Sequence, residues 1–483
     1  MRFSGTWLAL GLGIGLAGCT VGPDFVPPAN QAPSRWWGQD GRQGVSSPAG
    51  ITYGAAVDAR WWMGLGDPVL SALVERLAAE NLDLMQATER VQQGRAQRKV
   101  VASEGLPHIE AHDSYERMRS SPTGPSSLFE KVPGAPREYD DWRDSLGASW
   151  ELDLFGRVRR AVEAETANTE ALDEARHGIA LMAVADLVQN YIQLRGVQRL
   201  LAITGDNLAN ARKNVGLVRD RFANGVSTTL DIANAEAQRA TIQASLPQLR
   251  TEEAQLVNAI GLLLGQPPRA LEDELSRSLP QPVVPPAIPV GLPADLARRR
   301  PDVREAEARL HAATAQTGFA VASFYPDVRL MGNAGTESLQ FGRTFDLHSA
   351  FFSVGPSIDL PIFEGGRLRG TLRLRESQQR QAAISYRETV LRAWNEVDNA
   401  LTAFEQARRR RDDVAEAVKQ NTRALTAARQ RYVEGTVDFL NVIAAENAVL
   451  ESSRSLAETD TRIAVAFVAI YRSLGGGWET IAP

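Results

Sequence analysis

The chain has 483 residues, of which 43% are hydrophobic and 23% charged, a composition typical of a folded protein rather than a disordered one. Its 58 acidic residues outnumber its 53 lysines and arginines, and the resulting net charge of −5 provides no basic field to hold phosphates. The sequence therefore predicts no nucleic-acid partner.

The N-terminus has the layout of a cleaved secretion signal. Arg2 precedes an apolar stretch from Trp7 to Ala17, which is too short to cross a bilayer, and two small residues follow. We therefore expect residues 1–18 to be a signal peptide that is removed from the mature protein.

The only cysteine lies at the end of this signal. The run Leu16-Ala17-Gly18-Cys19 matches a bacterial lipoprotein cleavage box, so we expect Cys19 to become the mature N-terminus and to carry lipid on its sulfur. Thr20 stands where an aspartate would retain many such lipoproteins at the inner membrane, which favours the outer membrane. The alternative is an ordinary free thiol, because a lone cysteine is often a small core residue.

The sequence is internally duplicated. The segment Arg221-Phe222-Ala223-Asn224-Gly225-Val226 returns as Arg431-Tyr432-Val433-Glu434-Gly435-Thr436, at an offset of 431 − 221 = 210 residues. Pro107 likewise corresponds to Pro326. Between the two halves, residues 265–293 are rich in proline and predict a semi-rigid crossover. We therefore expect two structural repeats, 19–264 and 294–483.

Each half contains a long helix in which apolar residues recur at every seventh position, as in a coiled coil, with a single break at Arg411 in the second half. The two series are Leu187, Leu194, Leu201, Leu208, Val215 and Phe222, and Val390, Val397, Phe404, Val418, Leu425 and Tyr432. Each helix ends at a glycine turn, Gly225 or Gly435, and a second helix follows. We predict two helical hairpins, at about 157–264 and 367–474.

Before each long helix, apolar and polar residues alternate, which predicts two β-hairpins at about 107–155 and 326–362. Strands of about ten residues with one apolar face suit a tilted crossing of an outer membrane. Four strands cannot close a barrel, and an open edge in lipid leaves backbone groups unpaired, so the chain must oligomerise. Three copies would give twelve strands, although the spacing alone also permits two or four copies.

Two further runs carry a resemblance to a known family. Residues Cys19-Thr20-Val21-Gly22-Pro23-Asp24-Phe25-Val26-Pro27-Pro28 and Arg299-Arg300-Pro301-Asp302-Val303-Arg304-Glu305-Ala306-Glu307 resemble those of TolC-type outer membrane factors, in the lipidated branch that serves resistance-nodulation-division (RND) pumps. The resemblance extends from Cys19 to Trp478. It implies a mostly α protein with a membrane β part, in which a trimeric twelve-stranded β-barrel continues into a long coiled-coil α-helical barrel with a mixed equatorial belt.

The resemblance also implies a function. The chain would be the outer-membrane exit duct of a tripartite efflux system that exports small molecules such as drugs or other toxic compounds. Its partners would be two further copies in a homotrimer, a periplasmic adaptor protein, an inner-membrane RND-type transporter and outer-membrane lipid. Three alternatives remain: the outer-membrane component of a type I secretion system, a periplasmic adaptor lipoprotein, and a lipid-anchored coiled-coil protein or enzyme with helical decoration.

The sequence contains no motif for catalysis or cofactor binding. His108, Glu110 and His112 follow a strand pattern in the order His-x-Glu-x-His, which differs from the helical zinc-protease motif and favours a polar strand face over a metal site. No phosphate-binding glycine loop, nucleophile elbow or paired cysteine ligands occur in the sequence. We therefore expect a passive duct without catalytic residues, cofactor or metal.

The candidate sites lie at the two glycine turns. Similar proteins use such tips to meet the hairpins of a periplasmic adaptor, which assigns docking to Gly225-Val226-Ser227 and Gly435-Thr436-Val437. The glycines also have a purely local explanation, because they permit a left-handed turn.

The resemblance further implies a gate next to the second tip. The family often places aspartates there, but the matching positions are Asn441 and Ala444, so a carboxylate ring is not expected even though Asp438 and Asp231 lie nearby. We expect Leu440 to form a hydrophobic constriction instead. Arg431, beside Tyr432, is expected to pair with Asp231 of a neighbouring hairpin, which for exposed charges contributes only about 0–1 kcal/mol.

Overall fold

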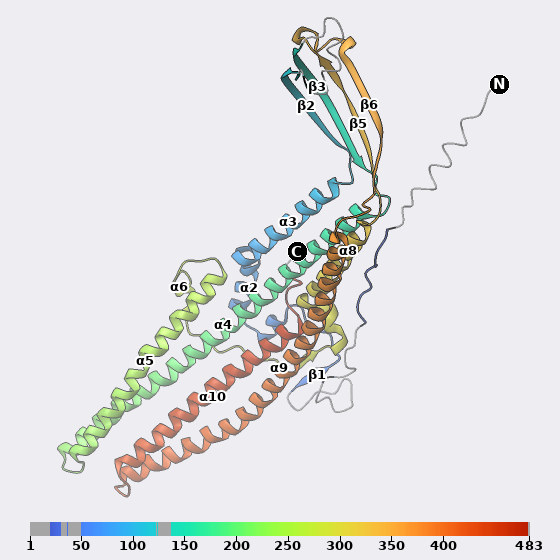
Figure 1. Cartoon of the computed structure of the whole chain (residues 1–483). Helices are drawn as coiled ribbons and strands as arrows, with labels where there is room; N and C mark the ends of the chain where they lie inside the picture. The colour runs from blue at the N-terminus through green and yellow to red at the C-terminus, as the bar shows by residue number, and fades with distance from the viewer. Residues whose placement is uncertain (1–19, 30–35, 37–49, 122, 124–136, 482–483) are drawn as a thin grey trace. The chain divides into compact units, whose positions relative to one another are not determined.

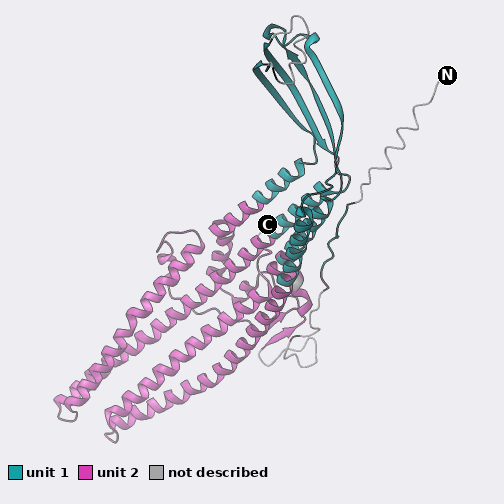
Figure 2. Ribbon diagram, viewed as in Figure 1, with its two compact units in different colours: residues 1–27, 92–171, 306–385 teal, residues 28–91, 172–305, 386–483 magenta. Residues whose placement is uncertain are grey.

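The structure is a computed structural model that describes residues 20–29, 36, 50–121, 123 and 137–481. The predicted signal peptide and Cys19 therefore lie outside the described residues. The chain forms two compact units, and each is assembled from both halves of the sequence (Figure 2). The first unit comprises 1–27, 92–171 and 306–385, and the second comprises 28–91, 172–305 and 386–483.

The first unit contains a four-stranded antiparallel sheet (Figure 1). Its strands are β2 (His108–Arg119), β3 (Glu138–Glu151), β5 (Asp327–Ser338) and β6 (Ala350–Asp359), in the order β2-β3-β5-β6. The prediction of four strands is confirmed. The connection between β5 and β6 contains two short 3-10 helices, η4 (Phe341–Arg343) and η5 (Leu347–Ser349).

The register gives one face of the sheet a band of apolar rows, because directly paired residues project to the same side. Further along the strands the same face carries the paired Asp113 and Asp144. Ile109 pairs with Ala148, Ala148 with Gly332, and Gly332 with Val354. The next row, which contains His108 and Ser149, belongs to the opposite and more polar face. The alternation predicted from the sequence therefore holds across all four strands.

Four long helices form two hairpins (Figure 1). The outgoing helices, α4 (Arg157–Ala223) and α9 (Arg367–Val433), have 67 residues each, which corresponds to about 100 Å. The returning helices are α5 (Thr229–Leu263), which continues through Pro247, and α10 (Phe439–Leu474). Among the described helices, none is both long and apolar enough to span a membrane.

The heptad positions divide into buried and exposed members. Leu187, Leu194, Val397 and Phe404 are completely buried within the single chain. Phe222, the last member of the first series, retains 42% of its surface. The predicted apolar series therefore extends to a position, Phe222, whose side chain is not buried by the single chain.

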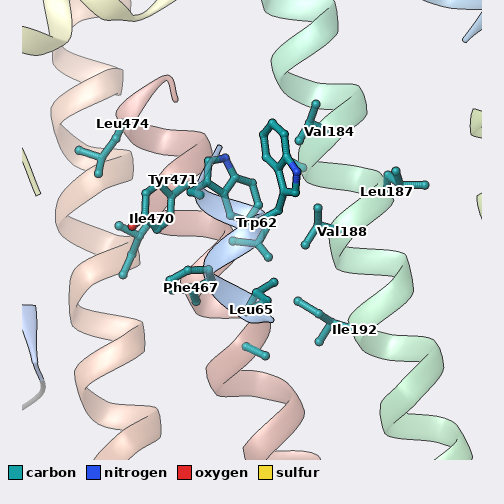
Figure 3. Packing of buried hydrophobic residues seen from close by; sticks show 14 of the residues in the cluster. Trp62, Leu65, Val184, Leu187, Val188, Ile192, Phe467, Ile470, Tyr471 and Leu474 are labelled. Atoms are coloured by element: carbon teal, nitrogen blue, oxygen red, sulfur yellow. The ribbon is translucent and has the colours of Figure 1, made fainter. Parts of the chain in front are cut away.

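The second unit has a large hydrophobic core between its helices (Figure 3). The 3-10 helix η1 (Trp61–Leu65) contributes Trp61, whose ring stacks on Tyr471 at 5.1 Å and whose Nε1 donates to the carbonyl of Gly476 at 3.1 Å. Helix α2 (Pro68–Glu80) adds buried leucines to the same core, and the side chain of Asp67 caps the N-terminus of this helix. The chain passes next through α3 (Leu82–Ser103).

The proline-rich segment is more structured than the predicted crossover. It contains α6 (Glu272–Leu275) and β4 (Ile288–Val290), and β4 pairs in parallel with β1 (Ile51–Tyr53). A strand of three residues is too short for its alternation to be recognised in the sequence, and its partner lies more than two hundred residues away. For this reason the sequence did not reveal the short elements within the predicted crossover.

The second repeat begins with two short elements, η3 (Pro293–Asp295) and α7 (Leu296–Arg299), and the helix α8 (Pro301–Ala322) follows. Between α7 and α8, the buried Arg300 pairs with Asp302 and Glu396, each at 2.7 Å, and donates to the carbonyl of Ser473 at 2.9 Å. Arg300 thus fixes the start of α8 to α9 and α10, so its role in this structure is packing.

Candidate functional site

The two hairpin tips have the same backbone geometry. Gly225 and Gly435 adopt positive φ values of 76° and 73°, and each ends a long helix. The amide of Gly225 donates to the carbonyl of Phe222 at 2.9 Å, and the amide of Gly435 donates to that of Tyr432 at 3.1 Å. Because a left-handed residue here satisfies the last helical carbonyls, the local role of both glycines is evident. Their role in docking stays a prediction.

The residues after the glycines lie at the exposed ends of the hairpins. Val226 retains 64% of its surface, and Thr436 is also exposed, whereas Ser227 and Val437 are half-buried. An exposed valine at a turn can contact a partner without any rearrangement of the chain. Val226 and Thr436 are therefore the most accessible of the four residues.

Asp231 has a clear structural role. Its Oδ2 accepts hydrogen bonds from the Thr228 amide at 2.9 Å and the Ser227 hydroxyl at 3.0 Å, while its own amide donates to the Thr228 hydroxyl at 3.2 Å. These reciprocal bonds form a capping box at the start of α5. Burial opposes ionisation, but the hydrogen bonds from Thr228 and Ser227 outweigh it and hold the pKa of Asp231 below its ordinary value.

The start of α10 differs from that of α5. Asp438 is its N-cap residue, but its side chain makes no capping hydrogen bond, and the amide of Asn441 donates instead to the Asp438 carbonyl at 3.0 Å. Leu440 retains 54% of its surface. The second tip thus presents an exposed leucine on a helix start that lacks a side-chain cap, which is compatible with the predicted gate.

Within the described chain, Arg431 and Asp231 are not brought together. The bridge between the hairpins comes from the first repeat: the Arg221 guanidinium carbon lies 4.5 Å from the centre of the Tyr432 ring, and Nη1 donates to the Tyr432 carbonyl at 3.4 Å. Tyr432 is buried and its ring packs against Phe439. Arg221 was not among the predicted gate residues, although its repetition as Arg431 was a signal.

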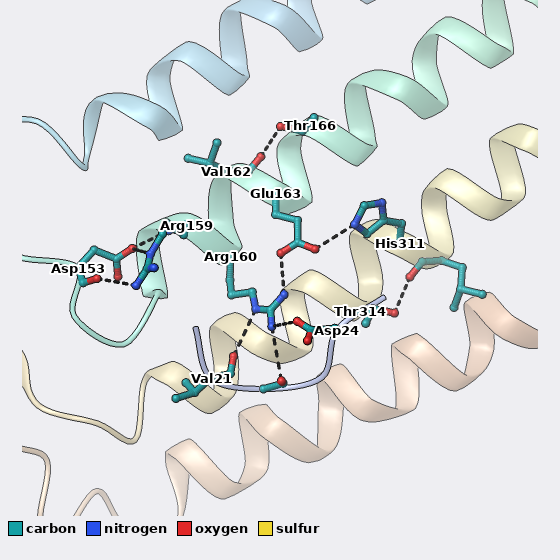
Figure 4. Close-up of polar contacts among 12 residues, drawn as sticks. Val21, Asp24, Asp153, Arg159, Arg160, Val162, Glu163, Thr166, His311 and Thr314 are labelled. Carbon is teal, nitrogen blue, oxygen red and sulfur yellow. Dashed lines mark hydrogen bonds and ion pairs between the residues drawn. The ribbon is translucent and has the colours of Figure 1, made fainter. Parts of the chain in front are cut away.

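A second candidate site lies in the first unit, where the N-terminal segment that contains Val21 and Asp24 contacts helix α4 (Figure 4). Arg160 of α4, with 4% of its side chain exposed, pairs with Asp24 at 2.6 Å and with Glu163 at 2.8 Å. Its Nε also donates to the carbonyl of Val21 at 3.3 Å. Glu163 in turn contacts His311 of α8 at 3.0 Å.

Close packing reinforces this attachment. Phe25 stacks on the ring of His311 at 4.4 Å, and the Val21 amide donates to the carbonyl of Phe155 at 3.2 Å. A Cβ added to Gly22 would lie 2.5 Å from the Cα of Gly318, so only glycine permits this approach. The residues that directly follow Cys19 are therefore fixed to the folded chain, a feature that no sequence pattern revealed.

The structure brings no metal site together in the part of the chain that it describes. His108 lies 3.7 Å from Glu110, and both side chains are about 70% exposed on the polar face of the sheet.

Comparison with known proteins decides the family. The family model described as "Outer membrane efflux protein" matches residues 73–266 and 292–476, once in each half of the chain. The chain belongs to the outer membrane efflux protein family. Its duplicated helical hairpins and four-stranded sheet are thus the architecture of this family, and the predicted resemblance is confirmed.

Individual members of the family match over nearly the whole chain. Outer membrane protein OprJ of Pseudomonas aeruginosa is 30% identical, with 98% of this chain and 95% of the relative covered. The toluene efflux pump outer membrane protein TtgF of Pseudomonas putida is also 30% identical, with 99% and 98% covered. The solved structure of the outer-membrane channel OprN matches with a TM-score of 0.86 and 33% identity, over 95% of this chain and 100% of that chain.

As an outer membrane efflux protein, the chain is a channel component of an efflux system and not an enzyme. Its location is the outer membrane. Membership also excludes two of the alternatives from the sequence, the periplasmic adaptor and the structural or enzymatic coiled-coil protein. The fold prediction is confirmed in its mostly helical architecture with a four-stranded sheet.

Proposed function

We propose that three copies of this chain form one exit duct, in which each copy contributes four strands to a closed twelve-stranded barrel. The supporting observation is the sheet itself: among the described strands, β2 and β6 each have a partner on one side only. A sheet with an apolar band on one face and two open edges is unsuited to lipid, because its edge amides and carbonyls would stay unpaired. Joining β6 of one copy to β2 of the next removes every open edge.

The tips are proposed to dock on a periplasmic adaptor, which connects the duct to an inner-membrane RND-type transporter. The exposure of Val226 and Thr436 at the two turns supports this role. The duct is a channel component and not an enzyme, and the energy for export is supplied by the transporter. The cargo is a small molecule such as a drug or another toxic compound, as the name of the relative TtgF indicates for toluene.

The experiment for these partners uses cysteines at the tips. Val226→Cys and Thr436→Cys avoid the positive φ of the adjacent glycines, and each variant carries a thiol-linked photocrosslinker in intact cells. We expect covalent adducts with an adaptor protein, and a matched variant on the exposed Thr402 of α9 should give none. Adducts only with components of a type I secretion system would favour that alternative. Native mass spectrometry of the purified protein tests the trimer, and a monomeric mass would contradict it.

We further propose that Cys19 carries the lipid and that the Arg160 contacts hold the anchored segment against the folded chain. The support is the position of the attachment, which begins at the residue after Cys19. Cys19→Ser should abolish incorporation of labelled palmitate while some assembly in the membrane persists, because the apolar face of the sheet also binds lipid. Label on the variant would contradict the lipoprotein assignment.

A further inference from the structure

The contact between Arg221 and Tyr432 joins the two repeats of one chain at their tips. Arg221 lies in the last turn of α4 of the first repeat, and its guanidinium lies over the Tyr432 ring of the second repeat at 4.5 Å. Such a cation–π contact gains strength when the ring is withdrawn from water, and Tyr432 keeps only 8% of its surface.

The tips of the two repeats share an ion pair at equivalent positions. Arg219 pairs with Glu236 at 2.6 Å in the first hairpin, and Arg429 pairs with Glu446 at 2.7 Å in the second, 210 residues later in each case. Both long helices also have the same number of residues and end in the same glycine turn. The offset of 210 is therefore a structural equivalence as well as a sequence repeat.

The counterparts of Arg221 and Tyr432 are Arg431 and Phe222. Phe222 retains 42% of its surface, in contrast to the buried Tyr432. Arg431 is exposed, and within the described part of the chain its guanidinium makes no hydrogen bond or ion pair. Both halves of an arginine–aromatic contact are thus present on the tips without being joined.

A ring of copies supplies the missing contact. In a closed ring, the first repeat of each copy has the second repeat of its own chain on one side and that of the adjacent copy on the other. We propose that Arg431 of one copy lies over the ring of Phe222 of the next, in the geometry that Arg221 and Tyr432 show within one chain. This inference rests on the ring of copies proposed above, and it assigns the exposed Phe222 surface to a second copy of this chain.

Two repeats meet at two kinds of seam: the first and second repeats of one chain, and the second repeat of one copy with the first repeat of the next. We expect the seam between copies to be weaker than the seam within a chain. Within the chain, Asn214 also donates to Glu446 at 2.7 Å, and Gln238 bonds Asn447. The repeat counterparts of Asn214, Gln238 and Asn447 are Ala424, Ala448 and Ala237, which have no polar side chain. Neither of these bonds can therefore recur between copies. The seam held by Arg431 and Phe222 is consequently the one that parts first when the tip opens.

The contact is tested by crosslinking the purified full-length protein. The double variant Phe222→Cys/Arg431→Cys is treated with a short bismaleimide, because an arginine side chain spans more than the Cβ separation that a disulfide allows. We expect covalent dimers and trimers on denaturing gels. The matched control is Arg221→Cys/Tyr432→Cys, in which the replaced arginine and aromatic residue are in contact within one chain. Its crosslink should form inside that chain, so the band on the gel should have the mass of a single chain.

The outcomes separate this inference from the proposed function. Single-chain mass for both double variants, in a preparation that is trimeric by light scattering, would overturn the Arg431–Phe222 contact and leave the trimer intact. A preparation that is monomeric by light scattering would overturn both. Multimers from Phe222→Cys or Arg431→Cys alone would also contradict the proposed geometry, because like positions of different copies are not neighbours in it.

A second measurement tests the weaker seam. Arg431→Ala and Arg221→Ala remove equivalent arginines, and the leak conductance of each purified channel is recorded in planar bilayers. Arg431→Ala should raise the leak more than Arg221→Ala, because the seam within the chain keeps the bonds of Asn214 and Gln238. An equal or greater leak for Arg221→Ala would overturn the assignment of the seam that parts first.

Discussion

Arg160 of the long helix α4 reaches Asp24 of the N-terminal segment at 2.6 Å, across 136 residues of sequence. The arginine is buried, whereas most of the Asp24 side chain is open to solvent. The same guanidinium also contacts Glu163 and the carbonyl of Val21, so one side chain joins the segment after Cys19 to the helix. A chain that is anchored by lipid at Cys19 would transmit any pull on the anchor through this contact.

Arg160→Gln should release the N-terminal segment. Hydrogen bonds to a charged group contribute about 1.5–3 kcal/mol, and the shorter amide cannot reach Asp24 and Glu163 together. We expect faster limited proteolysis between residues 20 and 29 under conditions in which the rest of the fold stays intact. Arg159→Ala, which removes a more exposed pair with Asp153, is the matched control and should leave this rate unchanged. Equal rates for Arg160→Gln and the unmodified chain would show that packing alone holds the segment.

Asp231→Ala should loosen the start of α5. Loss of a capping interaction costs about 1 kcal/mol, so hydrogen exchange at the first turn should accelerate roughly fivefold. The matched control is Asp438→Ala at the start of α10, where no side-chain cap exists, and its exchange rate should hardly change. If both variants behave alike, the capping box makes no contribution that the second hairpin lacks.

The same capping box should be sensitive to acid. Because the pKa of Asp231 in the folded chain lies below its ordinary value, ionised Asp231 stabilises the fold. This contribution is fully present above the ordinary aspartate pKa of about 3.9 and is lost as the pH falls through the lower folded value. At pH values below about 4, the exchange protection of the first turn of α5, corrected for intrinsic exchange rates, should therefore decrease. In Asp231→Ala, which lacks the titrating carboxyl group, this decrease should be absent.

Leu440→Ala should raise the conductance of the isolated channel if Leu440 narrows the tip. Leu440 is exposed in the single chain, so its removal creates no cavity within that chain. The measurement is single-channel recording. The control is Leu262→Ala, which removes an exposed leucine at the end of α5 that lies far from the tip of the first hairpin. Ala444→Asp should add block by divalent cations. Strong divalent block of the unmodified channel would instead reveal a carboxylate ring and contradict the hydrophobic gate.

Phe404→Ala should destabilise the chain by about 3–5 kcal/mol, because the ring is fully buried and its removal leaves a cavity. Denaturation followed by circular dichroism measures the loss, and the exposed Thr402→Ala on the same helix provides the control. Since Phe404 is buried in the single chain, the loss should not depend on protein concentration. A concentration-dependent loss would place Phe404 in an interface between copies.

The sequence by itself determined the features that depend on local periodicity and on repetition. The heptads around Leu194 and Phe404 define long helices, because seven-residue spacing places apolar groups on one side of a helix. Alternation in the segments before these helices defines the four strands for the same kind of reason. The two copies of the glycine turn, at Gly225 and Gly435, also marked the tips as candidate sites without any knowledge of their contacts.

The tertiary structure decided which side chains meet. Arg221 and Arg431 are equivalent in sequence, yet only Arg221 finds its aromatic partner within the chain, because the two hairpins pack against each other on one side. The three-residue strand β4 and the buried Arg160 carry no periodic signal, since their partners lie far away along the chain. Periodicity reports the face of an element that is buried, but the choice of partner depends on the packing of all elements together.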